Sequence, residues 1–260
     1  MTQTAHGYAG ATWAGGPSLV YDRLSEAMVA HSPVPLTGAL ALDMGAGTGA
    51  ATRALAKAGA HLVASDLAFD MVAYDRLARP PAVVGDARAL PFATGAFDVA
   101  VAAFVLNHLL DPGAAVAEAA RVTRPGGAVL AAGFAAGNDH PAKKAVEEAA
   151  SRRGWEVPAW YVDLKQRSEP LTSTPEALAG VARRAGLVDV SISEEAVDVG
   201  LADPAGLVAW RLGMPFLAGF AEALADDERR SLVAEAEEAL GPSPEPYRPL
   251  VLVLSSTVAA

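Results

Sequence analysis

Short apolar runs alternate with helical patterns between residues 39 and 134, and this alternation limits the possible folds more than any other feature of the chain. The runs are nearly continuous in apolar character, as expected for strands that are covered on both faces. Repeated strand–helix–strand units are joined by right-handed crossovers. The sequence therefore predicts an α/β fold with a doubly wound, mainly parallel sheet. The five predicted strands are residues 39–44, 61–66, 81–86, 97–104 and 127–134.

Several helix starts are marked in the sequence. Asp111, Thr174 and Asp203 each precede a proline, and a capping side chain followed by proline is typical of a helix N-terminus. Two further strands are predicted after residue 186, which brings the sheet to seven. The last of them follows a long helical region instead of a single crossover helix. These two strands are predicted at residues 187–199 and 248–258, and the helices between the first five strands at 48–58, 69–78 and 112–123.

Two segments interrupt the strand–helix rhythm. Residues 1–36 contain one predicted helix, and residues 137–173 contain a charged helix at 143–153, which we interpret as solvent-facing. Loops beyond the strand ends are where such sheets bind ligands. We therefore predict an N-terminal helical lid at residues 1–36 and a core at 37–260. That core would carry a lid insertion at about 137–173 and a helical cover at about 203–240.

The composition excludes several classes of function. The chain has 260 residues, of which 52% are hydrophobic, so it can bury a large core and is not a disordered chain. It has no Cys, which excludes disulfides, thiolate metal sites and Cys nucleophiles. Lys and Arg total 20 against 30 Asp and Glu, and this balance of −10 argues against a nucleic-acid partner. No apolar stretch of about 18 residues and no secretory signal pattern occurs, so we expect a cytoplasmic protein without a membrane partner.

The strongest chemical signal directly follows the first predicted strand. Gly45, Gly47 and Gly49 form a G-x-G-x-G turn after Asp43 and open the first helix. Glycines let the backbone turn sharply and let a ligand approach main-chain atoms. The spacing differs from the G-x-G-x-x-G of dinucleotide binding, so a nicotinamide oxidoreductase is the less favoured alternative.

Acids end the next two predicted strands. Asp66 lies 21 residues after Gly45, and Asp86 lies 20 residues after Asp66. An acid at the second strand end can accept hydrogen bonds from ribose hydroxyls, and one at the third can accept from the exocyclic amine of an adenine. With the glycine turn, these acids predict a nucleoside pocket without a phosphate anchor. The alternative, in which the glycines only make turns and the acids only cap helices, requires three coincidences at matched strand ends.

At these positions the chain resembles the class I S-adenosylmethionine-dependent methyltransferases, most closely the small-molecule group similar to the ubiquinone and menaquinone biosynthesis enzymes. The resemblance covers about residues 36–134 and extends more loosely to the C-terminus. It implies a Rossmann-like sheet of seven strands whose last strand is antiparallel, with S-adenosyl-L-methionine as the cofactor. The motifs that carry it are LDxGxGxG from Leu42, Asp66-Leu67 with Met71, Gly85-Asp86-Ala87, Leu90-Pro91-Phe92 with Phe97-Asp98, Asn107-His108-Leu109, and RVxRPGG from Arg121.

The resemblance also implies roles for single residues. The glycine turn would flank the methionine moiety, Asp66 would hold the ribose, and the apolar side chains that follow it would pack on the adenine. Asp86 and the Ala87 amide would bind the adenine edge, and the main chain near Phe104 would lie by the methionine amino group. The expected cofactor-binding residues are Asp43, Gly45, Gly47, Gly49, Asp66, Leu67, Met71, Asp86, Ala87 and Phe104.

His108 follows the fourth predicted strand, where an acceptor would approach. Histidine titrates near neutral pH, so His108 is a candidate general base. The alternative is an orienting or simply packed histidine, because methyl transfer from a sulfonium often needs only alignment. The spacing of His6, His31 and His140 predicts no metal site.

Aromatic side chains concentrate in the segments outside the predicted core. Those near the N-terminus are candidates to close over a positively charged sulfur, and the others could form an apolar acceptor pocket. Trp210, Met214 and Phe216 have helical spacing, which also suits an ordinary core. The candidates are Tyr8, Trp13, Trp155, Trp160, Tyr161, Trp210, Met214 and Phe216.

The sequence as a whole predicts methyl transfer from S-adenosyl-L-methionine to a small, largely apolar molecule with an oxygen, nitrogen or carbon acceptor. The acceptor would displace the sulfur in line, with the rate gained from proximity and orientation. The alternative from another class is a protein that binds S-adenosylmethionine without transferring methyl, in a cyclase or ligand-sensing role. The expected partner is a small-molecule acceptor, with no nucleic acid and no membrane.

Overall fold

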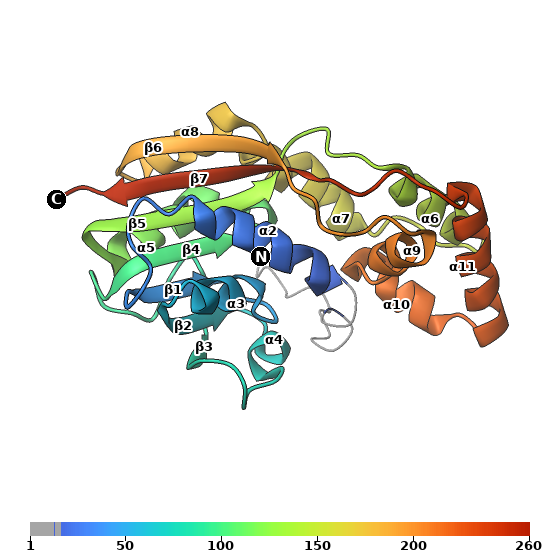
Figure 1. Ribbon diagram of the computed structural model, residues 1–260, viewed down its shortest axis with the longest axis horizontal. Helices are drawn as coiled ribbons and strands as arrows, with labels where there is room; N and C mark the ends of the chain where they lie inside the picture. Colours follow the sequence, from blue (N-terminus) through green and yellow to red (C-terminus); the bar gives the residue numbers. More distant parts are fainter. Residues whose placement is uncertain (1–12, 14–16) are drawn as a thin grey trace.

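The computed structural model of the protein describes residue 13 and residues 17–260, and its centre is a seven-stranded mixed sheet (Figure 1). The strands are β1 (Leu40–Met44), β2 (His61–Asp66), β3 (Ala82–Val84), β4 (Phe97–Ala103), β5 (Thr123–Phe134), β6 (Leu187–Ala196) and β7 (Leu250–Val258). Their order is β3-β2-β1-β4-β5-β7-β6. The first five strands are parallel, whereas β7 pairs antiparallel with both β5 and β6. The predicted seven-stranded sheet with an antiparallel last strand is therefore confirmed.

The direction in which strands are added reverses at β1. The chain first moves outward from β1 to β2 and β3, and then returns to the other side of β1 for β4 and β5. The connections that follow β1 and β4 therefore leave the sheet in different directions. Doubly wound sheets bind ligands in the crevice beyond the carboxyl ends of the strands at such a reversal.

Each face of the sheet has its own apolar core, because successive residues of a strand point to opposite faces. The helices on the two faces are α2 (Pro17–Ala30), α3 (Ala50–Lys57), α4 (Phe69–Ala73), α5 (Pro112–Val122) and α8 (Pro175–Arg184). Ala41 belongs to the core formed with α2 and α3, which includes Leu24 and Leu55. Leu42 belongs to the core formed with α5 and α8, which includes Val116 and Leu178. Coverage on both sides explains why the central strands are apolar without alternation.

A second group of helices packs beyond the carboxyl ends of the parallel strands, at the right of Figure 1. It comprises α6 (Pro141–Ser151), α7 (Ala159–Asp163), α9 (Pro204–Leu212), α10 (Pro215–Ala223) and α11 (Asp226–Leu240). Val146, Trp155, Phe216 and Leu232 lie in a separate buried cluster within this group. The predicted helical region at 204–240 is thus three helices. Within the described residues, no helix has both the length and the apolar character needed to cross a membrane.

The interpretation of the charged helix as solvent-facing is wrong for one of its sides. This helix is α6, which begins at Pro141 and buries Ala142 and Val146 completely. Lys143 on the same helix is half-buried. The packing of α6 against α9 and α11 turns one face inward, so its charged residues are divided between solvent and the interior.

Candidate functional site

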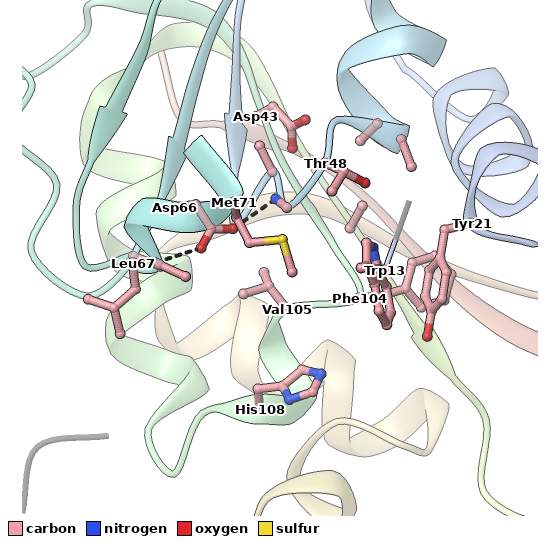
Figure 2. Close-up of a pocket in the computed structure, with 18 of the residues that line it drawn as sticks. Trp13, Tyr21, Asp43, Thr48, Asp66, Leu67, Met71, Phe104, Val105 and His108 are labelled. Atoms are coloured by element: carbon pink, nitrogen blue, oxygen red, sulfur yellow. Dashed lines mark hydrogen bonds between the residues drawn. The ribbon is translucent and has the colours of Figure 1, made fainter. Parts of the chain in front are cut away.

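A cavity opens at the carboxyl ends of β1, β2 and β4, with α2 along one side (Figure 2). Among the predicted cofactor residues only Gly49 is absent from its wall, because Gly49 instead precedes α3 as its N-cap. Trp13 and His108 also line the cavity, whereas Tyr8 lies outside the described residues. The predicted cofactor residues on the wall are Asp43, Gly45, Gly47, Asp66, Leu67, Met71, Asp86, Ala87 and Phe104.

The turn after β1 lies too close to the end of β4 to carry a side chain at its first glycine. Gly45 has a left-handed φ of +69°, and a Cβ placed on it would lie 2.5 Å from Cγ2 of Val105. Its backbone nitrogen donates to the carbonyl oxygen of Ser65 at 2.7 Å, which holds the turn against β2. Gly47 is also left-handed (φ +52°), but a Cβ there would meet nothing within 4 Å. Packing and backbone conformation both require a glycine at position 45. At Gly47, only the backbone conformation does, and there is open space beside the turn.

Asp66 is held by the backbone at the end of β2. Its Oδ2 accepts a hydrogen bond from the nitrogen of Gly47 at 2.8 Å, and its Oδ1 accepts one from the nitrogen of Ala68 at 2.9 Å (Figure 2). Burial raises the pKa of Asp66, and the two backbone donors and nearby Arg79 oppose this shift. The carboxylate is therefore fixed in position on the wall of the cavity.

Asp43 presents a buried carboxylate with one unused oxygen. Its Oδ2 accepts a hydrogen bond from the Thr52 hydroxyl at 2.6 Å, whereas its Oδ1 has no hydrogen-bond partner among the described residues. Burial raises the pKa of Asp43 to about 6, while the hydrogen bond from Thr52 acts in the opposite direction. A buried acceptor without a donor is destabilising. A positively charged ligand group in this cavity would supply that donor, so the wall fits a cationic ligand.

Arg79 is a contributor that the sequence did not reveal. Its Nη2 donates to the carbonyl oxygen of Gly47 at 3.1 Å, and its Nη1 donates to that of Met71. These bonds tie the glycine turn to α4. Burial lowers the pKa of Arg79, and the charges of Asp43 and Asp66 oppose this shift. Arg79 belongs to no recognisable motif, so its role depends on contacts that only the folded chain creates.

Asp86 lines the cavity, but its carboxylate already has a partner. Arg88 donates from Nη2 to Oδ2 at 2.7 Å, and from its backbone nitrogen to Oδ1 at 2.9 Å. The hydrogen bonds from the Arg88 side chain lower the pKa of Asp86. The predicted contact of Asp86 with an adenine amine stays a prediction, and Arg88 would share the carboxylate with that amine.

Aromatic rings form the side of the cavity next to α2. The ring of Tyr21 lies 5.1 Å from those of Trp13 and Phe104, and the Phe104 ring lies 5.0 Å from that of Phe134. Phe104 has a φ of +56°, which is strained for a residue other than glycine, and such strain clusters at functional sites. Tyr21 was not predicted from the sequence, because one aromatic residue inside a helix carries no signal of its own.

A second cavity of about 1020 Å³ lies beside the first, between the sheet and the helices beyond it. Tyr21 and His108 line both cavities and therefore mark their junction. Tyr161 stacks on Phe216, with 4.0 Å between ring centroids and 16° between ring planes. The predicted acceptor-side residues on its wall are Trp155, Trp160, Tyr161, Trp210, Met214 and Phe216.

Two of the remaining histidines hold the fold together. Nε2 of His31 lies 3.2 Å from Oε1 of Glu195. His140 caps α6, where its Nδ1 accepts from the nitrogen of Ala142 at 3.2 Å. His6 lies outside the described residues. In the part of the chain that the structure describes, no group of three or more His, Asp or Glu side chains is arranged to hold a metal ion.

Residues 42–131 match the family described as "Methyltransferase domain". The demethylmenaquinone methyltransferase of Mycolicibacterium paratuberculosis is 44% identical over 97 residues, which are 37% of this chain and 42% of that protein. The corresponding protein of Mycobacterium tuberculosis is 42% identical over 97 residues, again 37% of this chain and 42% of that protein. The match therefore spans about two fifths of the length of these relatives.

Solved structures share the fold at low sequence identity. Phosphoethanolamine N-methyltransferase 2 of Haemonchus contortus, in complex with S-adenosyl-L-methionine, is 18% identical with a TM-score of 0.56, over 91% of this chain and 52% of that one. At these identities the likeness concerns the fold alone, since a protein can keep a fold and change its chemistry. Residues 42–131 are thus similar to a methyltransferase domain, and the chain shares its fold with a solved methyltransferase in complex with S-adenosyl-L-methionine.

Proposed function

We propose that the protein transfers a methyl group from S-adenosylmethionine to a small, largely apolar molecule. The observation that carries this proposal is the pair of adjoining cavities, which meet at Tyr21 and His108. Two reactants held on either side of such a junction are brought into contact, and proximity supplies much of the rate in a displacement reaction. The names of the relatives that match residues in this domain agree with a methyl-transfer activity.

The side chains of the first cavity fit the cofactor. The unused Oδ1 of Asp43 would accept a hydrogen bond from its amino group, and Asp66 would bind the ribose hydroxyls. Leu67 and Met71 would contact the adenine, with Asp86 and its partner Arg88 at the adenine edge. When bound, S-adenosylmethionine supplies a methyl group on a positively charged sulfur, which an acceptor atom can displace.

The segments outside the sheet would enclose the acceptor. We propose that residues 1–36 act as an N-terminal lid, residues 137–173 as a lid insertion and residues 203–240 as a helical cover on a core of 37–260. Support comes from the second cavity, whose wall includes side chains of α2, α6, α7 and α9. Enclosure would exclude water and hold the acceptor in line with the methyl group.

His108 would act at the junction of the two cavities. Its place on both walls fits a role in accepting a proton from an acceptor hydroxyl or amine. The alternative function, binding of S-adenosylmethionine without methyl transfer in a cyclase or ligand-sensing role, is less well supported, because the family and the relatives that match this part of the chain are named as methyltransferases.

Two measurements test the proposal. Calorimetry should detect binding of S-adenosylmethionine and S-adenosylhomocysteine, and no binding of NADH. Incubation with methyl-labelled S-adenosylmethionine and a panel of aromatic, quinone-like and polyketide acceptors should transfer label to at least one of them. Binding of NADH instead of S-adenosylmethionine would contradict the proposal. Cofactor binding with no transfer to any acceptor class would favour the non-transferring alternative.

A further inference from the structure

The wall of the second cavity is not uniformly apolar, and its charged groups can be matched to partners. Most of the cationic side chains on it already form ion pairs with carboxylates. The paired cations are Lys144 with Glu148, Lys165 with Glu169, Arg211 with Glu147, and Arg152 with Glu235.

Lys143 is the cation on this wall that lacks a carboxylate partner. No carboxylate oxygen among the described residues lies within 4.0 Å of its Nζ. Its Nζ donates to the carbonyl oxygen of Asn138 and lies 6.0 Å from the centre of the Tyr247 ring. The nearby acid Asp139 accepts instead from the backbone nitrogen of His140 at 2.8 Å. The ammonium group therefore reaches the cavity wall without a carboxylate in contact.

The surroundings of Lys143 favour an anionic ligand. Burial and the charges of Arg211 and Lys165 lower the pKa of Lys143 to about 8, while Asp139 and Glu169 oppose this shift. Arg211 lies on α9, Lys165 on η2 (Leu164–Ser168) and Glu169 on η3 (Glu169–Leu171), so the field at the ammonium comes from several elements. Arg211 and Lys165 are paired with Glu147 and Glu169, whereas the half-buried ammonium of Lys143 has no carboxylate in contact, so an anionic ligand would stabilise it.

The remainder of the wall offers flat aromatic surfaces. Trp160 lies 5.8 Å from Tyr161, and Tyr161 is stacked on Phe216. The guanidinium of Arg211 lies 4.5 Å from the centre of the Phe216 ring. Such rings bind a planar, apolar ligand body by stacking and by edge contacts.

We infer that the second cavity takes an aromatic acceptor that carries an anionic oxygen, with the anion held by the ammonium group of Lys143 and the ring held by the aromatic wall. This inference rests on the proposed function and names the substrate class of the same site. An acceptor of this class differs from a purely apolar one, which would leave the Lys143 ammonium desolvated without a partner. Lys143 is then a specificity-determining residue and takes no part in the transfer of the methyl group.

Ligand binding without turnover tests this inference. The probes are 2-naphthoate, which is an anion at neutral pH, and 2-naphthamide, which has a similar shape and no charge. Quenching of tryptophan fluorescence measures their binding to the full chain at pH 7. We expect 2-naphthoate to bind roughly 10- to 100-fold more tightly than 2-naphthamide, since a hydrogen bond to a charged group is worth that ratio.

Three variants locate the effect. Lys143→Met should remove the preference for naphthoate and leave naphthamide affinity within about twofold, whereas Lys143→Arg should retain most of the preference. Lys57→Met is the control, because Lys57 lies on α3 outside the walls of both cavities and its side chain is 72% exposed. It should change neither affinity by more than about twofold. The preference for naphthoate should also fall as pH rises through about 8, as the ammonium loses its proton.

Calorimetry with S-adenosylhomocysteine on the same samples separates the two proposals. If the cofactor binds but wild type does not prefer naphthoate, or Lys143→Met keeps that preference, the inference about Lys143 is overturned and the proposed function survives. If naphthoate binding depends on Lys143 but neither S-adenosylmethionine nor S-adenosylhomocysteine binds, the cavity is an anion-selective aromatic site and the proposed methyl transfer is wrong. Unchanged cofactor affinity in Lys143→Met shows that the variant is folded.

Discussion

Oδ2 of Asp66 accepts a hydrogen bond from the backbone nitrogen of Gly47 at 2.8 Å, which joins the ends of β2 and β1 across 19 residues of sequence. The bond places the open side of the glycine turn next to the acid on one wall of the first cavity. Two features that the sequence analysis treated as separate parts of a nucleoside pocket are thus one hydrogen-bonded unit. A change at Asp66 is expected to affect both.

Asp66→Ala should lower the affinity for S-adenosylmethionine by at least about tenfold. The variant loses the proposed ribose acceptor and leaves two backbone donors, those of Gly47 and Ala68, without their partner. Asp66→Asn retains one oxygen and should have an intermediate affinity. Isothermal calorimetry measures both, with the exposed acid of α11 in Asp227→Ala as the control. An Asp66→Ala protein that binds as tightly as wild type would show that the ribose assignment is wrong.

Gly45→Ala should destabilise the fold by about 2–4 kcal/mol. Left-handed backbone costs a residue with a Cβ roughly 1–2 kcal/mol, and the overlap with Val105 adds a packing strain of similar size. Gly126→Ala is the matched control, because Gly126 has a φ of +71° but open space around its Cβ position. Urea unfolding should show that Gly126→Ala lowers the free energy of unfolding by only about 1–2 kcal/mol. Equal losses in the two variants would contradict the close contact between the turn and Val105.

The titration of Asp43 should lower the free energy of unfolding as pH rises from about 4 to about 6. Burial raises the pKa of Asp43 from 3.8 to about 6, so the folded protein holds this proton in a range where the unfolded chain has released it. Asp43→Asn keeps an acceptor for Thr52 and removes the titration, so it should abolish the part of this decrease that falls between pH 5 and pH 7.5, which is about 1–2 kcal/mol. Urea unfolding at the two pH values measures the difference between variant and wild type.

Asp98→Asn provides a comparison of opposite sign. The hydrogen bond from Arg124 lowers the pKa of Asp98, so this carboxylate contributes stability above its ordinary pKa that is lost as pH falls. Asp98→Asn should therefore be less stable than wild type at pH 7.5, whereas Asp43→Asn should be at least as stable.

The same Asp43→Asn protein should bind S-adenosylmethionine more weakly at pH 7.5, because its side chain no longer offers a negative charge to the ligand. Unchanged affinity would remove Asp43 from the proposed cofactor site.

His108→Gln should lower kcat by roughly 100-fold while cofactor affinity stays within about threefold, if the histidine accepts the proton of the acceptor. The measurement is the rate of label transfer at several pH values, with calorimetry on the same protein. The pH dependence of kcat should differ between wild type and the variant, because the variant lacks the group that accepts the proton. A variant with an unchanged kcat and pH profile would assign His108 a packing role.

The sequence by itself determined the sheet and much of the first cavity. Continuous apolar runs identify strands covered on both faces, and Asp66 and Asp86 follow two such runs directly, so their positions at the carboxyl edge depend on local pattern alone. The strand boundaries were predicted less exactly. The edge strand β3 has only three residues, Ala82–Val84, against six predicted, and it pairs with β2 alone.

Only the tertiary structure decided which side chains meet across the cavities. Tyr21 reaches the first cavity from a helix without a motif, and Arg79 donates to the carbonyl oxygen of Gly47 in the glycine turn. Val105 reveals why Gly45 has no room for a side chain. Lys143 and Lys144 are identical neighbours in sequence, yet the first is half-buried without a carboxylate in contact and the second is exposed and paired with Glu148. Adjacent helical residues point about 100° apart, so the surface that α6 packs against decides which of the two lysines is buried.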